Sequence, residues 1–187
     1  MKYKKWSSIF CMVLVTCLLA CDVGVDPLVQ QDKPFFDLLT FFGQEQEKNK
    51  AVKSFRKSIR LDDQMEQQQL DSLDLATELA LFTKSDINKT AWLDKYTIDS
   101  IYGSNQQLEG LQYRAKEDKL TTRSIEIAFN TTGQVDSVMI VNASSSMVAQ
   151  SDEWLTYVPG QGYRIKHLQK VTAQPEHALI VDVKFVY

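Results

Sequence analysis

The chain has 187 residues, 44% of them hydrophobic, and a formal net charge of −3 at pH 7. This length and hydrophobic content allow one substantial core and favour a single folded domain. The basic residues form no block in the sequence, so we expect no nucleic-acid partner and no attraction to anionic lipid headgroups.

The first 20 residues have the layout of a secretory signal peptide. Lys2, Lys4 and Lys5 precede an apolar stretch over residues 9–20. This stretch is shorter than the about 20 residues that a helix needs to span a bilayer. It ends in Leu18-Leu19-Ala20-Cys21, which resembles the lipobox of bacterial lipoproteins.

The lipobox resemblance implies that a peptidase removes residues 1–20 and that the thiol of Cys21 carries a lipid. Cys21 is therefore the expected lipid-attachment site, and residues 21–32 are the lipidated cysteine and a short tether. That tether spans at most about 40 Å, so the folded part is expected close to the membrane. The other cysteines, Cys11 and Cys17, lie in the removed segment, which leaves no thiol for a disulfide, a zinc site or a nucleophile.

The resemblance is to small envelope lipoproteins of Gram-negative bacteria, and it implies a lipid-anchored location in the cell envelope. We expect the outer membrane rather than the inner membrane. Asp22 instead favours the inner membrane, because in enteric bacteria an aspartate directly after the lipidated cysteine tends to retain a lipoprotein there. Other lineages do not follow that rule.

The segment 33–95 is predicted to be mostly helical. Asp32 can cap a first helix that begins at Lys33-Pro34 and ends near Gly43. A second helix is predicted over 71–84, and a short helical piece from Ser85. Between them, 52–69 suits a hairpin with a turn at Asp62-Asp63-Gln64, although its apolar spacing also suits a helix.

After Lys95 the apolar pattern changes to a period of two, which is typical of half-buried strands. The predicted strands are 96–102, 107–116, 123–130, 135–142, 153–158, 163–172 and 178–187. The connections between them are too short for crossover helices, so neighbouring strands should be antiparallel. The predicted fold class is α+β, with N-terminal helices packed on a C-terminal antiparallel meander of about six to seven strands within a single domain over 33–187.

The sequence contains no recognisable catalytic motif. His167 and His177 are its only histidines, and two histidines without cysteine make a poor metal site. No Gly-x-Ser-x-Gly elbow occurs, and Gly160-Gln161-Gly162 lies between two predicted strands, where it indicates a hairpin turn. We expect no catalytic residue, no metal and no cofactor.

Three serines lie in Asp-Ser-aliphatic tripeptides: Ser72, Ser100 and Ser137. This pattern resembles the acceptor sequence of a general O-glycosylation system in some Gram-negative anaerobes, which modifies exported proteins. The alternative is structural, since Ser72 can also cap a helix and the other two lie in or beside predicted strands.

These observations favour a non-enzymatic lipoprotein that binds an envelope protein or a glycan, or supports assembly. One alternative is a carrier of a hydrophobic ligand, with a curved sheet like the half-barrels of lipoprotein carriers. Another is a hydrolase of envelope polymers, which would need a cleft with converging carboxylates or a serine–base pair.

Overall fold

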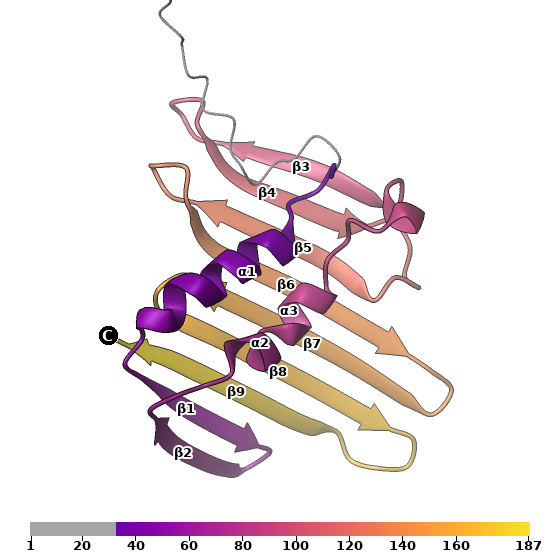
Figure 1. The fold of residues 1–187 in the computed structure, drawn as a ribbon. Helices are drawn as coiled ribbons and strands as arrows, with labels where there is room; N and C mark the ends of the chain where they lie inside the picture. The colour runs from indigo at the N-terminus through magenta and orange to yellow at the C-terminus, as the bar shows by residue number, and fades with distance from the viewer. Residues whose placement is uncertain (1–32) are drawn as a thin grey trace, which may run out of the picture.

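The computed structural model describes residues 33–187, and its main feature is one nine-stranded antiparallel sheet (Figure 1). The predicted signal peptide, the predicted lipid-attachment site Cys21 and the predicted tether lie outside the described residues. The strands are β1 (Ser54–Leu61), β2 (Gln64–Leu70), β3 (Tyr96–Tyr102), β4 (Leu108–Ala115), β5 (Thr122–Phe129), β6 (Val135–Ser145), β7 (Ala149–Val158), β8 (Gly162–Val171) and β9 (His177–Val186). Their order across the sheet is β2-β1-β9-β8-β7-β6-β5-β4-β3.

Strands β3 to β9 form a meander in which each strand pairs with its neighbour in sequence. This confirms the predicted antiparallel sheet, and six of the seven strand starts fall within one residue of their predicted positions. The exception is β7, which begins at Ala149 and not at Glu153. Residues 149–152 carry no apolar alternation, but β6 and β8 pair with them from both sides and keep them extended.

The hairpin predicted over 52–69 is confirmed as β1 and β2, which join at Asp62 and Asp63. Asp62 adopts a positive φ of 51° at the turn, and its carboxylate accepts hydrogen bonds from the His177 ring and the Ala178 amide. Strand β1 pairs with β9, so the first strand of the chain lies beside the last one.

The prediction that 33–95 is mostly helical is wrong, and the described chain is predominantly β. The helices are α1 (Leu38–Lys48), α2 (Leu75–Glu78) and α3 (Ala80–Lys84), with short 3₁₀ turns η1 (Asn49–Ala51) and η2 (Thr90–Trp92). The segment predicted as one helix over 71–84 is divided at Leu79, which ends α2 and caps α3.

Helix α1 begins five residues later than predicted and passes through Gly43. Asp37 caps it, because its Oδ1 accepts a hydrogen bond from the Thr40 amide at 3.0 Å. A glycine inside a helix costs about 1 kcal/mol relative to alanine. The buried rings of Phe41 and Phe42, two residues and one residue before it, hold the helix on the sheet.

All three α-helices lie on the same face of the sheet (Figure 1). Phe42 and Phe82 extend from α1 and α3 to the ring of Tyr157 on β7, with ring centroids 5.1 and 6.2 Å away. Phe35 and Phe36, which precede α1, are also buried. The aromatic segment before and within α1 is therefore part of the core and does not lie on the surface of the described chain.

A buried polar network links α1 to the sheet and to the last residue. The Tyr157 hydroxyl donates a hydrogen bond to Glu45 and accepts one from Asn49, both at 2.9 Å. Asn49 in turn accepts a hydrogen bond from Tyr187, while Lys48 pairs with Glu45 at 2.8 Å. Burial, together with the neighbouring carboxylate of Glu45, raises the pKa of Tyr157.

We predict that Tyr157→Phe lowers the free energy of unfolding by about 1–3 kcal/mol, because two buried polar groups lose their shared partner. Urea denaturation measures this change. Tyr102→Phe is the matched control, since Tyr102 is 63% exposed and its hydroxyl should contribute less than about 0.5 kcal/mol. Equal stability of the Tyr157→Phe variant and the parent protein would contradict the role of the network.

Candidate binding surface

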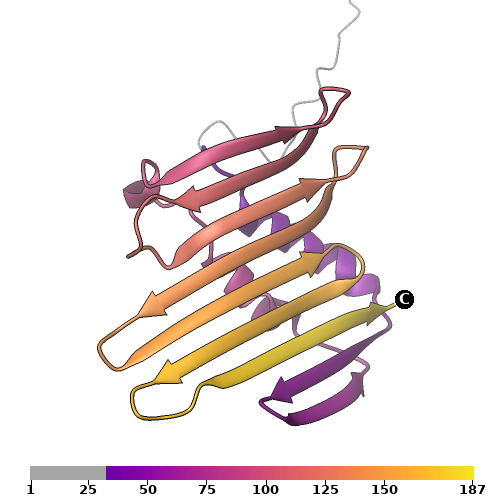
Figure 2. The same ribbon diagram turned by 180° about the vertical axis from the view of Figure 1, so that it is seen from behind.

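The face of the sheet opposite the helices, here called the open face, is covered by none of the described helices (Figure 2). Side chains alternate between the two faces along each strand. Leu155 and Tyr157 on β7 are buried under the helices, so Trp154 and Thr156 lie on the open face. Because residues paired across two strands point to the same face, the pairing then assigns the side chains of the other strands to one face or the other.

Five cationic side chains lie on adjacent strands of the open face, and we call them the cationic cluster. They are Arg56 and Arg60 on β1, Arg164 and Lys166 on β8, and Lys184 on β9. Strands β1, β9 and β8 are consecutive in the sheet. Because neighbouring strands are about 4.8 Å apart, the cluster forms a mainly basic area around Asp182, on a chain that is acidic overall.

Only one member of the cationic cluster is neutralised by an acid of the described chain. Arg164 Nε lies 2.5 Å from Asp182 Oδ1, and this hydrogen bond raises the pKa of Arg164. Lys166 instead lies over the ring of Trp154, with Nζ 4.9 Å from the ring centroid. Arg56 and Lys184 are register partners on β1 and β9, and like charges in that position destabilise a sheet.

Two shallow hollows flank the Arg164–Asp182 pair on the open face. The first, the Gly162 hollow, has a volume of about 350 Å³ and is bordered by Thr156, Gly162 and Lys184. The second, the Ile180 hollow, has a volume of about 180 Å³ and is bordered by Arg60, Lys166 and Ile180. Arg164 and Asp182 line both, so each hollow has an unneutralised cation on one side and the ion pair on the other.

Gly162 is required for the close approach of β8 to β9 beside the first hollow. Its φ is +139°, and a Cβ at this position would lie 1.9 Å from the carbonyl oxygen of Val183. A side chain can therefore not be accommodated without displacing the backbone of β9.

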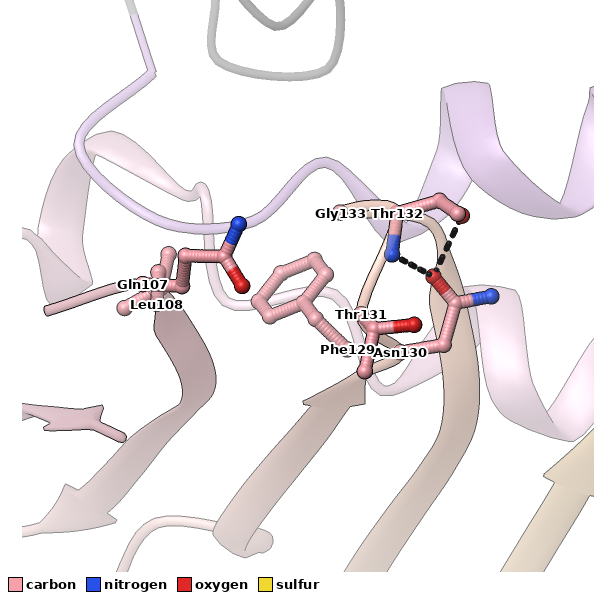
Figure 3. A pocket seen from close by; sticks show the side chains of 7 residues that line it. All are labelled: Gln107, Leu108, Phe129, Asn130, Thr131, Thr132 and Gly133. Atoms are coloured by element: carbon pink, nitrogen blue, oxygen red, sulfur yellow. Dashed lines mark hydrogen bonds between the residues drawn. The ribbon is translucent and has the colours of Figure 1, made fainter. Parts of the chain in front are cut away.

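A further hollow, of about 290 Å³, lies between the β3–β4 and β5–β6 turns (Figure 3). Two of its polar side chains, Asn130 and Thr132, build the β5–β6 turn. Asn130 Oδ1 accepts hydrogen bonds from the Thr132 amide and hydroxyl and from the Gln134 amide. This hollow is therefore explained by turn structure, and we assign it no ligand.

A second polar group lies on the helix-covered side, where β6 to β8 extend past α3. Ser151 Oγ is 3.4 Å from His167 Nε2, and His167 Nδ1 is 3.1 Å from Glu153 Oε1. Asn142 donates hydrogen bonds to Glu153 and to Ser85, but its buried Oδ1 has no partner among the described residues. The order serine, histidine, carboxylate is the one used in acyl transfer.

The surroundings of Ser151 do not favour catalysis. An acyl-transfer site needs free N–H donors where the oxyanion forms. Ser151 lies inside β7, which pairs with β6 and β8 on both sides, so the nearby backbone amides are used in the ladder. The contacts of Ser151, His167 and Glu153 are therefore those of hydrogen-bonded neighbours on the paired strands β7 and β8.

The three serines of the Asp-Ser-aliphatic pattern are not brought together. Ser72 is exposed between β2 and α2, and Ser100 is exposed on the edge strand β3. Ser137 is half-buried on β6, opposite Ala128. Ser72 does not cap α2, since Asp74 does so.

Among the described residues, no group of three or more His, Cys, Asp or Glu side chains is placed to hold a metal ion. His167 and His177 each contact a carboxylate, Glu153 and Asp62. No helix within 33–187 is long and apolar enough to cross a membrane. No protein-family model matches the chain, and a search of curated proteins finds no match.

Sequence reasoning missed the cationic cluster, although part of its signal was present. Arg164 and Lys166 are two residues apart, and Arg56 and Arg60 four apart, so each pair lies on one face of its strand. The pairing of β1 with β9, which joins the two pairs through Lys184, left no signal in the sequence.

We predict that Lys184→Gln raises the free energy of unfolding by up to about 1 kcal/mol at low ionic strength, because it removes the repulsion from Arg56. The gain should vanish in high salt, which screens exposed charges. Arg164→Gln is the control, since it removes a paired cation and should give no gain. Thermal unfolding at two salt concentrations measures both variants, and an unchanged Lys184→Gln variant at low salt would contradict the repulsion.

Proposed function

We propose that this chain is a lipid-anchored protein of a Gram-negative cell envelope that acts by binding and not by catalysis, through the open face of its sheet. The observation that carries this proposal is the cationic cluster, four of whose five charges have no acidic partner among the described residues. Like charges that are adjacent and unneutralised destabilise the free protein. A negatively charged partner would relieve that repulsion.

The anchor is supported by the signal layout and by Cys21 in the lipobox sequence. We assign the protein to the outer membrane rather than the inner membrane, with the short tether keeping the folded part near the bilayer. The fold that follows the tether fits the α+β class, in which helices from the first half of the chain cover one face of the C-terminal meander.

Binding on the surface is better supported than transport of a hydrophobic ligand inside the sheet. The space between helices and sheet is occupied by rings in contact, among them Phe42, Phe82 and Tyr157, each fully buried. A carrier of a hydrophobic ligand would need a cavity in this region, and the buried rings fill it. The hydrolase alternative depends on Ser151 and His167, whose position inside paired strands lacks free N–H donors.

We predict that Cys21→Ser abolishes incorporation of labelled palmitate and moves the protein from the membrane to the soluble fraction, because the acyl chains supply the attachment. Cys17→Ser is the matched control and should keep both. Separation of inner and outer membranes by density then tests the location. Membrane retention of the Cys21→Ser variant equal to that of the parent protein would refute the anchor.

The role of the open face is tested by lysine labelling in intact envelopes. If the face is occupied there, Lys166 and Lys184 should react several-fold more slowly with an amine-reactive reagent than in the purified protein. Lys119, which is 75% exposed outside this face, should react equally in both. Equal reactivity of Lys166 and Lys184 in the two preparations would refute a binding role for the open face.

A further inference from the structure

The layout of the cationic cluster carries information about the chemistry of its ligand. Residues that pair across neighbouring strands form rows perpendicular to the strands. Lys184 pairs with Gly162 in one row, and Ile180 pairs with both Lys166 and Arg60 in another. These rows are four residues apart along β8, which corresponds to roughly 13 Å. The Arg164–Asp182 pair lies between them.

We propose that the open face binds an acidic oligosaccharide. One anionic group lies against Lys184 in the Gly162 hollow, and a second lies against Arg60 and Lys166 in the Ile180 hollow. This inference rests on the proposed function, since it names the ligand of the same surface. The separation of the two cationic positions requires a ligand longer than one sugar unit.

The groups between the cations match a ligand that carries hydroxyls as well as charges. Asp182 is a hydrogen-bond acceptor, while Ser58 and Thr156 can each donate and accept, and all three border the hollows. Sugar hydroxyls pair with such mixed groups. The larger hollow is at the lower end of the size range of small-molecule sites.

Trp154 adds an apolar surface next to the cationic cluster. It is 38% exposed and is the register partner of Lys166. An exposed indole ring offers a flat apolar area with one polar N–H, which suits the apolar face of a sugar ring. Single-stranded nucleic acid would instead need several aromatic side chains for successive bases, and Trp154 is the only aromatic side chain that the described strands place on the open face.

Two other anionic partners fit the open face less well. A bilayer of anionic lipids would meet the carboxylates of Asp152 and Asp182 on the same surface, and would not enter the hollows beside Gly162 and Ile180. The centre of a protein–protein interface is depleted of charged residues, whereas the centre of this surface is an ion pair.

The test measures binding of the full chain, purified in detergent, to polygalacturonate as the acidic polysaccharide. Neutral dextran and polyglutamate are the comparison polymers, the first without charge and the second without sugar. We expect binding to polygalacturonate that weakens with salt, no binding to dextran, and at least severalfold weaker binding to polyglutamate.

Variants locate the site. Lys184→Gln and the pair Arg60→Gln with Lys166→Gln should each weaken polygalacturonate binding about tenfold, as expected for loss of a charge-assisted contact. Trp154→Ala should weaken it without changing the salt dependence. Lys119→Gln is the matched control and should bind as the parent protein does. Circular dichroism confirms that each variant is folded.

Three results would overturn the proposal: no binding to polygalacturonate, equal binding to polyglutamate, or binding that the cluster variants leave unchanged. Binding only to vesicles of phosphatidylglycerol, and to none of the polymers, would also overturn it in favour of a membrane surface. If Lys166 and Lys184 are nevertheless protected in intact envelopes, only the ligand class is refuted. If they are also unprotected, the proposed function is refuted as well.

Discussion

Tyr157 packs against Phe41, Phe42 and Phe82, and its hydroxyl hydrogen-bonds with Glu45 and Asn49 in the middle of the same contact. The rings supply apolar burial, while the polar groups admit only one position of α1 over β7. An antiparallel sheet needs only one buried face. Once the helices are held here, alternation along every strand assigns each remaining side chain to the covered or the open face.

The position of the open face therefore follows from the core, and the arrangement of its cations differs from that of the ion pairs elsewhere in the described chain. Most ion pairs there are local, such as Lys50 with Glu47 or Lys119 with Glu117. On the open face, cations from three strands lie close together, and Asp182 pairs with Arg164 alone. A surface that retains such repulsion in the free protein is consistent with an anionic ligand, and this is the basis of the function proposed for it.

The group of Ser151, Glu153 and His167 shows why distances alone do not define a catalytic site. Its hydrogen bonds have the order expected of a triad, yet a central strand has no free backbone amide to stabilise a negative oxygen. The cationic cluster has the opposite character. Apart from Arg164, none of its side chains pairs with an acid of the described chain, and all but Arg56 border hollows that a ligand can enter.

The alternating pattern by itself predicted the seven strands of the meander and their antiparallel order, and it favoured the hairpin at Asp62 over a helix, because side-chain periodicity and turn residues act locally. The signal-peptide layout and the lipobox sequence predicted lipid attachment at Cys21, which lies outside the described residues. Only the tertiary structure decided that β1 joins β9, and hence that Arg56 and Arg60 lie beside Lys184. Any alternating strand offers the same N–H and C=O groups to a neighbour, so which distant strands pair depends on how the whole core packs. The end of α1 also depends on core packing. The burial of Phe41 and Phe42 outweighs the helix-weakening effect of Gly43, so the helix continues to Lys48.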